Sequence, residues 1–514
     1  MVPSARATPV SWPQAHFPAR KDRAMPAETA APKLDTSHVD EEALESNRSV
    51  FAGRMGIALA VLAGVYAIFH MAVLNGWSIR AWTGVDIPGL PVFPMETWNF
   101  RIVHIAGALI LGFLFYAARP FKDVSGRHPL DWLAWAALLP ALFASVTALR
   151  FASDIAGGVQ WNGIDAGIRS AEIWQFGVPL IVATAVAILV GWARPRSRDT
   201  IAPADLVLCT SAIAVAIYLI TIYGTLMRNA TGTPFAPIGI SLAAVAGTAL
   251  IMEMTRRVAG LALVVIAGIF LIYVFVGDLL PGFLNAPNIE WARFFSQVYT
   301  DAGILGPTTA VSSTYIILFI IFAAFLQASK VGEYFVNFAF AAAGRARGGP
   351  AKVAIFASGL MGMIYGTSAG NVVATGSLTI PLMNRVGYRP RTAGAVEAAA
   401  STGGQIMPPI MGAGAFIMAE ITGIAYTDIA IAAIIPAVLY FVFVYFIVDF
   451  EAAKMGMRGM NEDELPKFAD MARKAFLFLP ILILIGALFM GYSVIRAGTL
   501  ATAAAAIVSW LTPY

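Results

Sequence analysis

Two polar, glycine-rich stretches interrupt otherwise apolar sequence, at residues 366–371 (GTSAGN) and 401–409 (STGGQIMPP). Their serine, threonine and asparagine side chains are hard oxygen ligands, of the kind that bind hard cations such as sodium. Carbonyl groups freed where a helix unwinds add further oxygens. The first N–H groups of a helix suit a substrate carboxylate instead. The two stretches therefore predict an ion site and a neighbouring carboxylate site.

The glycines and prolines of these stretches favour breaks in a helix. Gly366, Gly370, Gly403 and Gly404 permit positive φ and a close approach of backbones. Pro408 and Pro409 lack an N–H, so we expect the carbonyls of residues 402–405 to lose their partners within the helix. Broken helices are tolerated at membrane depth only where they are buried in protein or line a wet cavity. Two such breaks close together indicate the binding site of a secondary transporter.

Two other interpretations of the first stretch remain open. Gly362, Gly366 and Gly370 have the spacing of small residues at packed membrane helices. Residues 366–370 also match G-x-S-x-G, the turn that carries the nucleophilic serine of some hydrolases, which would be Ser368. Those enzymes place a histidine after the serine, whereas all five histidines of this chain lie within its first 128 residues. A membrane-embedded enzyme that uses Ser368 is therefore the weaker alternative.

Glu397 lies four residues before the second stretch, in an alanine-rich segment. A carboxylate inside a membrane is a functional candidate by default, either in proton coupling or in an embedded enzyme. The alternative position is near the inner surface, paired with Arg391 about two helical turns away. Between these two positions we prefer the second.

The composition identifies a polytopic membrane protein. Of the 514 residues, 59% are hydrophobic and only 12% are charged, whereas soluble domains carry about 25% charged residues. The single cysteine, Cys209, excludes a disulfide within the chain and a cysteine-based metal site. The net charge of +4 is small and does not suggest nucleic-acid binding.

Apolar runs of about 20 residues, the length that crosses a bilayer, recur along the chain. They lie near 52–74, 101–118, 130–150, 173–193, 204–223, 235–253, 258–277, 313–329, 428–448, 475–493 and 498–511. Short loops with three basic residues alternate with loops that have one, so the positive-inside rule places the N-terminus in the cytoplasm. Residues 1–48 have charges and prolines but no apolar period, and are predicted to be a disordered cytoplasmic tail.

Basic residues flank the segment 353–383 on both sides, so both of its ends are predicted to lie inside. Its 31 residues are too many for one simple crossing and too few for two, which need about 40. We therefore predict a re-entrant helical hairpin with its tip at 366–371, followed by a helix that breaks at 403–409. The preceding segment 330–343 is either an amphipathic arm along the inner interface or an extension of the helix before it.

These segments resemble the tripartite ATP-independent periplasmic (TRAP) transporter family. Residues 366–377 (GTSAGNVVATGS) and 380–383 (IPLM) look like the hairpin of its membrane subunits, and residues 398–409 (AAASTGGQIMPP) look like the broken helix that follows. The similarity is nearest to fused permeases of the TAXI type, in which a small four-helix subunit and the large subunit form one chain. It is specific over about 350–450, whereas the four spans before Arg194 fit the small subunit by number only.

The resemblance implies an all-α, polytopic membrane protein with an elevator-type, ion-transporter-like fold. It implies uptake of an organic acid, a small carboxylate, across the bacterial inner membrane, driven by a sodium gradient and supplied by a periplasmic substrate-binding protein. Sodium is the coupling ion, and no other cofactor is implied. Carried over from the family, the sodium site lies at or beside six residues: Gly366, Ser368, Asn371, Thr402, Gly403 and Gln405. The substrate is expected to contact Thr367, Asn371 and Pro408.

The resemblance also divides the chain. The predicted parts are a tail (1–48), a scaffold domain like the small subunit (49–199), the first repeat of the transport domain (200–450), and a cytoplasmic loop with the start of a second repeat (451–514). The family's large subunit has a second hairpin, which we do not find before Tyr514. We therefore expect a truncated chain, or one completed by another polypeptide. A non-transporting assembly subunit is the alternative function.

Overall fold

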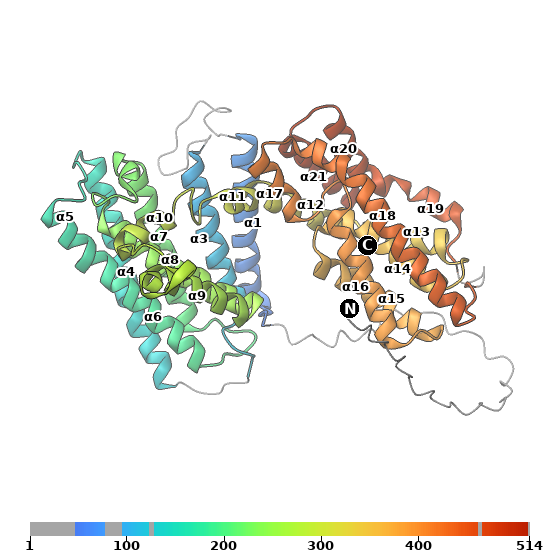
Figure 1. The fold of residues 1–514 in the computed structure, drawn as a ribbon, viewed down its shortest axis with the longest axis horizontal. Coiled ribbons are helices and arrows are strands. Elements are labelled where there is room, and N and C mark those ends of the chain that lie inside the picture. Colours follow the sequence, from blue (N-terminus) through green and yellow to red (C-terminus); the bar gives the residue numbers. More distant parts are fainter. Residues whose placement is uncertain (1–46, 78–94, 123–127, 461–464, 512–514) are drawn as a thin grey trace, which may run out of the picture. The chain divides into compact units, whose positions relative to one another are not determined.

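The computed structural model describes residues 47–77, 95–122, 128–460 and 465–511, whose regular structure is helical (Figure 1). Ten helices within these ranges are long and apolar enough to cross a membrane. This confirms the predicted all-α polytopic class. The predicted disordered tail lies outside the described residues, apart from its last two.

The helices between residues 53 and 298 pack around one hydrophobic core. They are α1 (Gly53–Asn75), α3 (Thr97–Phe115), α4 (Pro129–Ala156), α5 (Ala166–Ala171), α6 (Val178–Ala193), α7 (Pro203–Tyr223), α8 (Ile238–Ala259), α9 (Leu261–Val276) and α10 (Trp291–Val298). A π-helical turn, Glu172–Gly177, joins α5 to α6. The core crosses the predicted domain boundary at residue 199, because α7 packs against both α4 and α6.

Helix α4 shows how sequence sets this packing. Alanines recur along its buried side at intervals of three and four residues, at positions 134, 137, 141, 144 and 148. These positions share one face of a helix, and such small side chains let the backbone of α7 come close. The opposite side of α4 exposes large apolar residues such as Leu139, as expected for a surface that faces lipid.

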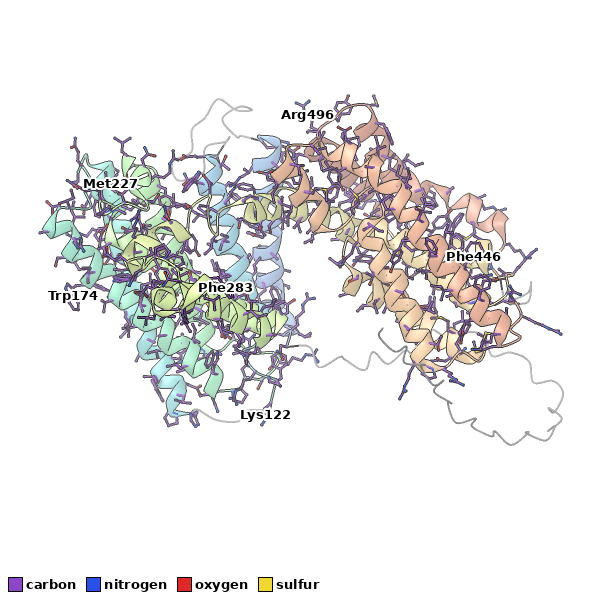
Figure 2. All side chains as sticks on the ribbon, viewed as in Figure 1. Lys122, Trp174, Met227, Phe283, Phe446 and Arg496 are labelled. Atoms are coloured by element: carbon purple, nitrogen blue, oxygen red, sulfur yellow. The ribbon has the colours of Figure 1, made fainter. Side chains whose placement is uncertain are left out.

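The remaining described helices follow residue 306. They are α11 (Pro307–Val311), α12 (Ile317–Ala328), α13 (Val331–Ala343), α14 (Gly349–Tyr365), α15 (Ser368–Arg385), α16 (Pro390–Gly403), α17 (Ala413–Thr422), α18 (Tyr426–Lys454), α19 (Phe468–Arg473), α20 (Leu479–Phe489) and α21 (Val494–Leu511). A π-helical turn, Ser312–Ile316, joins α11 to α12. Figure 2 shows large apolar side chains that point outward, including Phe446 on α18 and Phe283 in the loop after α9.

The predicted hairpin is present as α14 and α15, which pack against each other. The segment 330–343 before it is a separate helix, α13. Lys330 adopts a left-handed conformation with φ of 59° at the junction with α12. This conformation ends a helix, so the interpretation of 330–343 as a simple extension is wrong. Helix α13 packs its buried side chains against α14.

Ionic contacts fix the base of the hairpin to α18. The Lys352 ammonium lies 2.5 Å from a carboxylate oxygen of Asp449, and the Arg347 guanidinium pairs with the other oxygen. This pairing raises the pKa of Arg347. Tyr388, in the turn after α15, is buried nearby; burial, followed by the negative charges of Glu451 and Asp449, raises the pKa of its hydroxyl to about 12. Tyr388 is therefore neutral at physiological pH.

Candidate functional site

The tip of the hairpin is a tight turn of two residues. Helix α14 ends at Tyr365, Gly366 follows in the left-handed conformation with φ of 59°, and Thr367 is extended before α15 begins. A Cβ on Gly366 would lie 2.4 Å from the carbonyl oxygen of Met411. Glycine is therefore required for two reasons, the positive φ and the close approach of the second broken segment. The break is shorter than predicted, because Ser368 already starts the next helix.

The second broken segment runs from the end of α16 to the start of α17. A single 3₁₀ turn, Gly404–Ile406, follows α16, and the chain then stays non-helical until Gly412. The Gly412 N–H donates to the Gln405 carbonyl at 2.7 Å, and the Tyr426 hydroxyl contacts the carbonyls of Pro409 and Ile410. The prediction of a break is confirmed.

The carbonyls of residues 404 and 405 lose their partners within the α-helix, as expected, but neither is left unpaired. The Gly404 carbonyl accepts from the Met407 N–H at 3.3 Å, and the Gln405 carbonyl accepts from Gly412. Both gain partners from the irregular chain that follows Pro408 and Pro409. The physical reason is that the segment curls back on itself, so that backbone N–H groups beyond the prolines replace those that the prolines lack.

The two broken segments meet at a contact between backbones. A Cβ on Gly404 would lie 2.7 Å from the Cα of Gly362 and 2.9 Å from the Nδ2 of Asn371. The fully buried Asn371 side chain donates through Nδ2 to the Ser358 carbonyl at 2.7 Å. Its Oδ1 is buried and accepts no hydrogen bond from any described residue. A strong acceptor oxygen therefore lies without a donor at the junction of α14, α15 and the second break.

A second contact joins the segments nearer the surface. The Gln405 Nε2 donates to the Ser368 hydroxyl at 3.1 Å, and both groups are solvent-accessible. Thr367 is exposed at the tip beside them. The structure thus brings together four of the predicted residues, namely Gly366, Ser368, Asn371 and Gln405.

Two predicted residues face away from the hairpin. Thr402 is exposed and donates its hydroxyl hydrogen to the Ala398 carbonyl of its own helix at 2.8 Å. A Cβ on Gly403 would collide with Tyr440 at 2.5 Å, so Gly403 packs against α18. The glycine that contacts the hairpin is its neighbour Gly404, which the sequence indicated as a position of close backbone approach but not as part of the ion site.

Pro408, predicted to contact substrate, lines an apolar cavity of about 270 Å³ between the second break, α18 and α20. Met363, Met407 and Ile434 are among its other lining residues. Among the described residues no charged side chain lines this cavity, and Thr427 is its one polar lining residue. The polar atoms of the junction lie instead on the hairpin side of the break.

Glu397 is fully buried and is bonded to hydroxyl groups. Its Oε1 accepts from Ser358 at 2.9 Å, from Ser401 at 3.2 Å and from Thr375, and its Oε2 accepts from Thr379 at 2.5 Å. We call these five residues the Glu397 cluster. The predicted pairing of Glu397 with Arg391 is therefore wrong.

A known protein family matches the part of the chain that contains both broken segments. The family described as "Tripartite ATP-independent periplasmic transporter, DctM component" matches residues 246–513, just over half of the chain. The chain belongs to this family. The DctM family consists of transporter permeases and not of enzymes, which confirms that the chain is not an enzyme.

Two curated proteins show weaker similarity. The "C4-dicarboxylate TRAP transporter large permease protein DctM" of Pseudomonas aeruginosa is 28% identical over 174 residues, which are 34% of this chain and 40% of that protein. The "Uncharacterized protein y4mL" of Sinorhizobium fredii is 24% identical over 159 residues, 30% of this chain and 38% of that protein. The chain thus spans about two fifths of the length of these relatives. The TRAP permease resemblance is confirmed at the level of the DctM family.

Proposed function

We propose that this DctM-family chain is the membrane permease of a sodium-driven secondary transporter that takes up a small organic carboxylate. A periplasmic substrate-binding protein supplies the substrate, and the chain lies in the bacterial inner membrane with its N-terminus in the cytoplasm. The name of the Pseudomonas relative makes C4-dicarboxylates the first substrates to test.

The observation that carries the proposal is the unpartnered Oδ1 of Asn371. A buried polar atom without a hydrogen bond costs free energy of about 1–3 kcal/mol. A sodium ion beside it would bind this amide oxygen and use further oxygens from the backbone around Gly404. The bound cation would give the buried amide oxygen a partner and so remove this free-energy cost, and the site would need no acidic residue.

The helix ends at the junction support both ligands. Helix α14 and the 3₁₀ turn after α16 direct their C-terminal, partly negative ends toward the broken segments, which favours a cation. Helix α15 begins at Ser368 beside the exposed Thr367, and no side chain caps its first N–H groups. Those donors suit a substrate carboxylate at the tip.

The proposed organisation follows the TAXI-type fused permeases. Residues 49–199 act as the scaffold and 200–450 as the first transport repeat. The packing of α7 against α4 and α6 supports a fused body rather than two tethered parts.

The test uses purified protein and, for uptake, proteoliposomes that contain the assembled transporter and its binding protein. Asn371→Ala removes the amide oxygen and is expected to weaken sodium affinity by about tenfold, the effect of losing one good ligand worth about 1.4 kcal/mol. Asn384→Ala changes an exposed asparagine at the other end of the same helix and serves as the matched control. Sodium affinity is measured from the concentration at which sodium raises the unfolding temperature.

An unchanged sodium affinity in a folded Asn371→Ala protein would place the ion elsewhere. Uptake that persists without sodium but follows a proton gradient would replace sodium coupling by proton coupling. Glu397→Gln would then be the next variant, because Glu397 is a buried carboxylate within the same helices. A protein that neither binds sodium nor supports uptake would favour the function of a non-transporting assembly subunit.

A further inference from the structure

A cavity of about 500 Å³ lies between the start of α4 and the loop that joins α6 to α7. Its lining includes Trp132, Trp135, Arg194, Arg196 and Thr200. Arg194 forms a two-bond pair with Asp131, with both N–O distances at 3.1 Å, so that pair is electrically neutral. The charge that matters for binding therefore comes from Arg196.

Arg196 belongs to a buried ionic network. Its Nη1 bonds to Asp205 at 2.8 Å, and Arg257 bonds to the other oxygen of Asp205 at 2.6 Å. Arg257 and Arg256 also pair with the two oxygens of Glu253. The ion pairs described here thus join three guanidinium groups to two carboxylates, which leaves one positive charge in excess.

The excess charge coincides with unused hydrogen-bond donors. The side chain of Arg196 is only 5% exposed, and its Nε has no hydrogen-bond partner among the described residues. The Nη2 of Arg257 is likewise buried and unpartnered. Burial lowers the pKa of Arg196, Asp205 opposes that effect, and Arg257 adds to it. A bound anion would act in the same direction as Asp205.

A helix that borders the cavity adds to its positive potential. Helix α7 begins at Pro203, which lines the cavity, whereas the first turn of α4, which also borders it, is already capped by His128 and Asp131. Helix N-termini carry a partial positive charge that attracts phosphate groups. Together with the positive charge of Arg196, which lines the cavity, the N-terminus of α7 favours a singly charged anion there.

The mouth of the cavity has the character of a membrane interface. Trp132 is 62% exposed and Trp135 is 46% exposed, and tryptophan is enriched at the level of lipid headgroups. Exposed apolar residues then continue along the same face of α4 at intervals of three and four: Leu139, Leu142, Val146 and Leu149. This stripe would contact the acyl chains of a lipid whose headgroup occupies the cavity.

We propose that this cavity binds the headgroup phosphate of an anionic phospholipid, such as phosphatidylglycerol. The phosphate balances the charge of the Arg196 network, the tryptophans pack against the glycerol region, and the acyl chains lie along α4. Basic pockets between membrane helices bind lipid headgroups in this manner. The lipid would hold the α6–α7 loop against α4, since both line the cavity.

The test measures binding of short-chain phosphatidylglycerol to the full-length protein in detergent. Thr200→Glu places a carboxylate in the cavity and is expected to weaken binding by roughly tenfold, since one surface charge is worth about 1 kcal/mol and this one lies within the site. Arg198→Gln lowers the net charge by the same single unit on the same loop, but Arg198 does not line the cavity. We expect Arg198→Gln to weaken binding less than about threefold.

Two further ligands separate the possible sources of the phosphate. Inorganic phosphate lacks acyl chains and is expected to bind at least about tenfold more weakly than the lipid, because each buried CH₂ contributes about 0.8 kcal/mol. Phosphatidylcholine has the same glycerophosphate but no net charge, and is expected to bind weakly as well. Equal binding of inorganic phosphate would overturn the lipid assignment, and equal binding of phosphatidylcholine would overturn the role of charge.

Tryptophan fluorescence gives a second readout that does not depend on folding differences. Brominated phosphatidylglycerol should quench the tryptophan fluorescence of the protein more than brominated phosphatidylcholine does. Replacing Trp132 and Trp135 by phenylalanine should abolish this difference in quenching. Trp174, which is exposed elsewhere (Figure 2), provides the control Trp174→Phe, which should leave the difference unchanged. Equal losses for Thr200→Glu and Arg198→Gln, or no preferential quenching, would refute the site.

Discussion

Gly404 is the residue that sets how closely the two broken segments approach. Its Cα faces Gly362 on α14 and the amide of Asn371 on α15. An added methyl group would meet backbone at 2.7 Å, and backbone within a helix cannot move aside as a flexible side chain can. The substitution must therefore push the second break away from the hairpin.

We expect Gly404→Ala to destabilise the protein by about 1–3 kcal/mol, the usual cost of overpacking. Because the substitution moves the second break away from the hairpin, it should also weaken sodium binding. Gly414→Ala in α17 is the matched control, because a Cβ there meets nothing within 4 Å. The midpoint of thermal unfolding, with and without sodium, checks both variants. Equal midpoints for the two would show that the backbone contact is not tight.

The sequence predicted which types of residue form the candidate site better than it predicted which way each residue faces. Asn371 was predicted because its side-chain oxygen is a hard ligand at the break and because the family resemblance places it at or beside the ion. Both Gly403 and Gly404 were expected to permit close backbone approach, but only Gly403 was assigned to the ion site. Adjacent glycines look alike in sequence, and only the helix rotation decides which one faces the hairpin. The spacing of Gly362 with Gly366 already indicated the face of α14 that packs closely, but it could not identify the partner.

At the scale of elements, the Glu397 cluster ties three helices together. Ser358 lies on α14, Thr375 and Thr379 lie on α15, and Glu397 itself lies on α16 with Ser401. At a site that water does not reach, the hydroxyl groups that donate to the carboxylate take the place of water molecules. The hairpin and the broken helix are thereby held as one unit.

Glu397→Ala is expected to lower the free energy of unfolding by about 2–4 kcal/mol, since several buried hydrogen bonds are lost. Glu397→Gln should cost less, because its amide keeps one acceptor and adds a donor that a hydroxyl can accept. Glu420→Ala removes an exposed carboxylate and should be close to neutral. Hydrogen exchange over residues 368–385 is the local readout; unchanged exchange in Glu397→Ala would mean that the cluster does not hold α15.

Element positions could be predicted where charge or length constrains them. Basic residues at both ends identified the hairpin, and apolar length identified the spans. The position of Glu397 could not be inferred from Arg391, and the reason is geometric. With 3.6 residues per turn, residues six apart lie about 120° apart around a helix, so the two side chains point to different faces. The cluster depends on contacts with α14 and α15, which no local pattern reveals.

At the scale of the whole molecule, the core that crosses residue 199 predicts a fused body. We expect a protease site inserted after Asp199, in the exposed part of the α6–α7 loop, to yield two fragments that remain associated in mild detergent. The reason is that α7 stays packed against α4 and α6 after the loop is cut. Co-elution in size-exclusion chromatography checks the prediction, and clean separation of the fragments would contradict it.

The orientation of the hairpin is the remaining test of the whole topology. Helices α14 and α15 have 17 and 18 residues, or about 25 Å each at 1.5 Å per residue. This length brings the tip deep into a bilayer but returns the chain to the side on which it entered. Arg347 and Arg389, exposed at the two ends of the hairpin, should therefore lie on the same side of the membrane.

Single cysteines at positions 347 and 389 should both react with a membrane-impermeant thiol reagent from the cytoplasmic side. The background is Cys209→Ala, which removes the one native cysteine, itself buried. Leu226→Cys, in the exposed turn after α7, reports the opposite side, because one crossing separates it from the basic α6–α7 loop. Labelling of 347 and 389 from opposite sides would make residues 349–385 an ordinary crossing. The junction between the two broken segments would then not be the mid-membrane ion site proposed above.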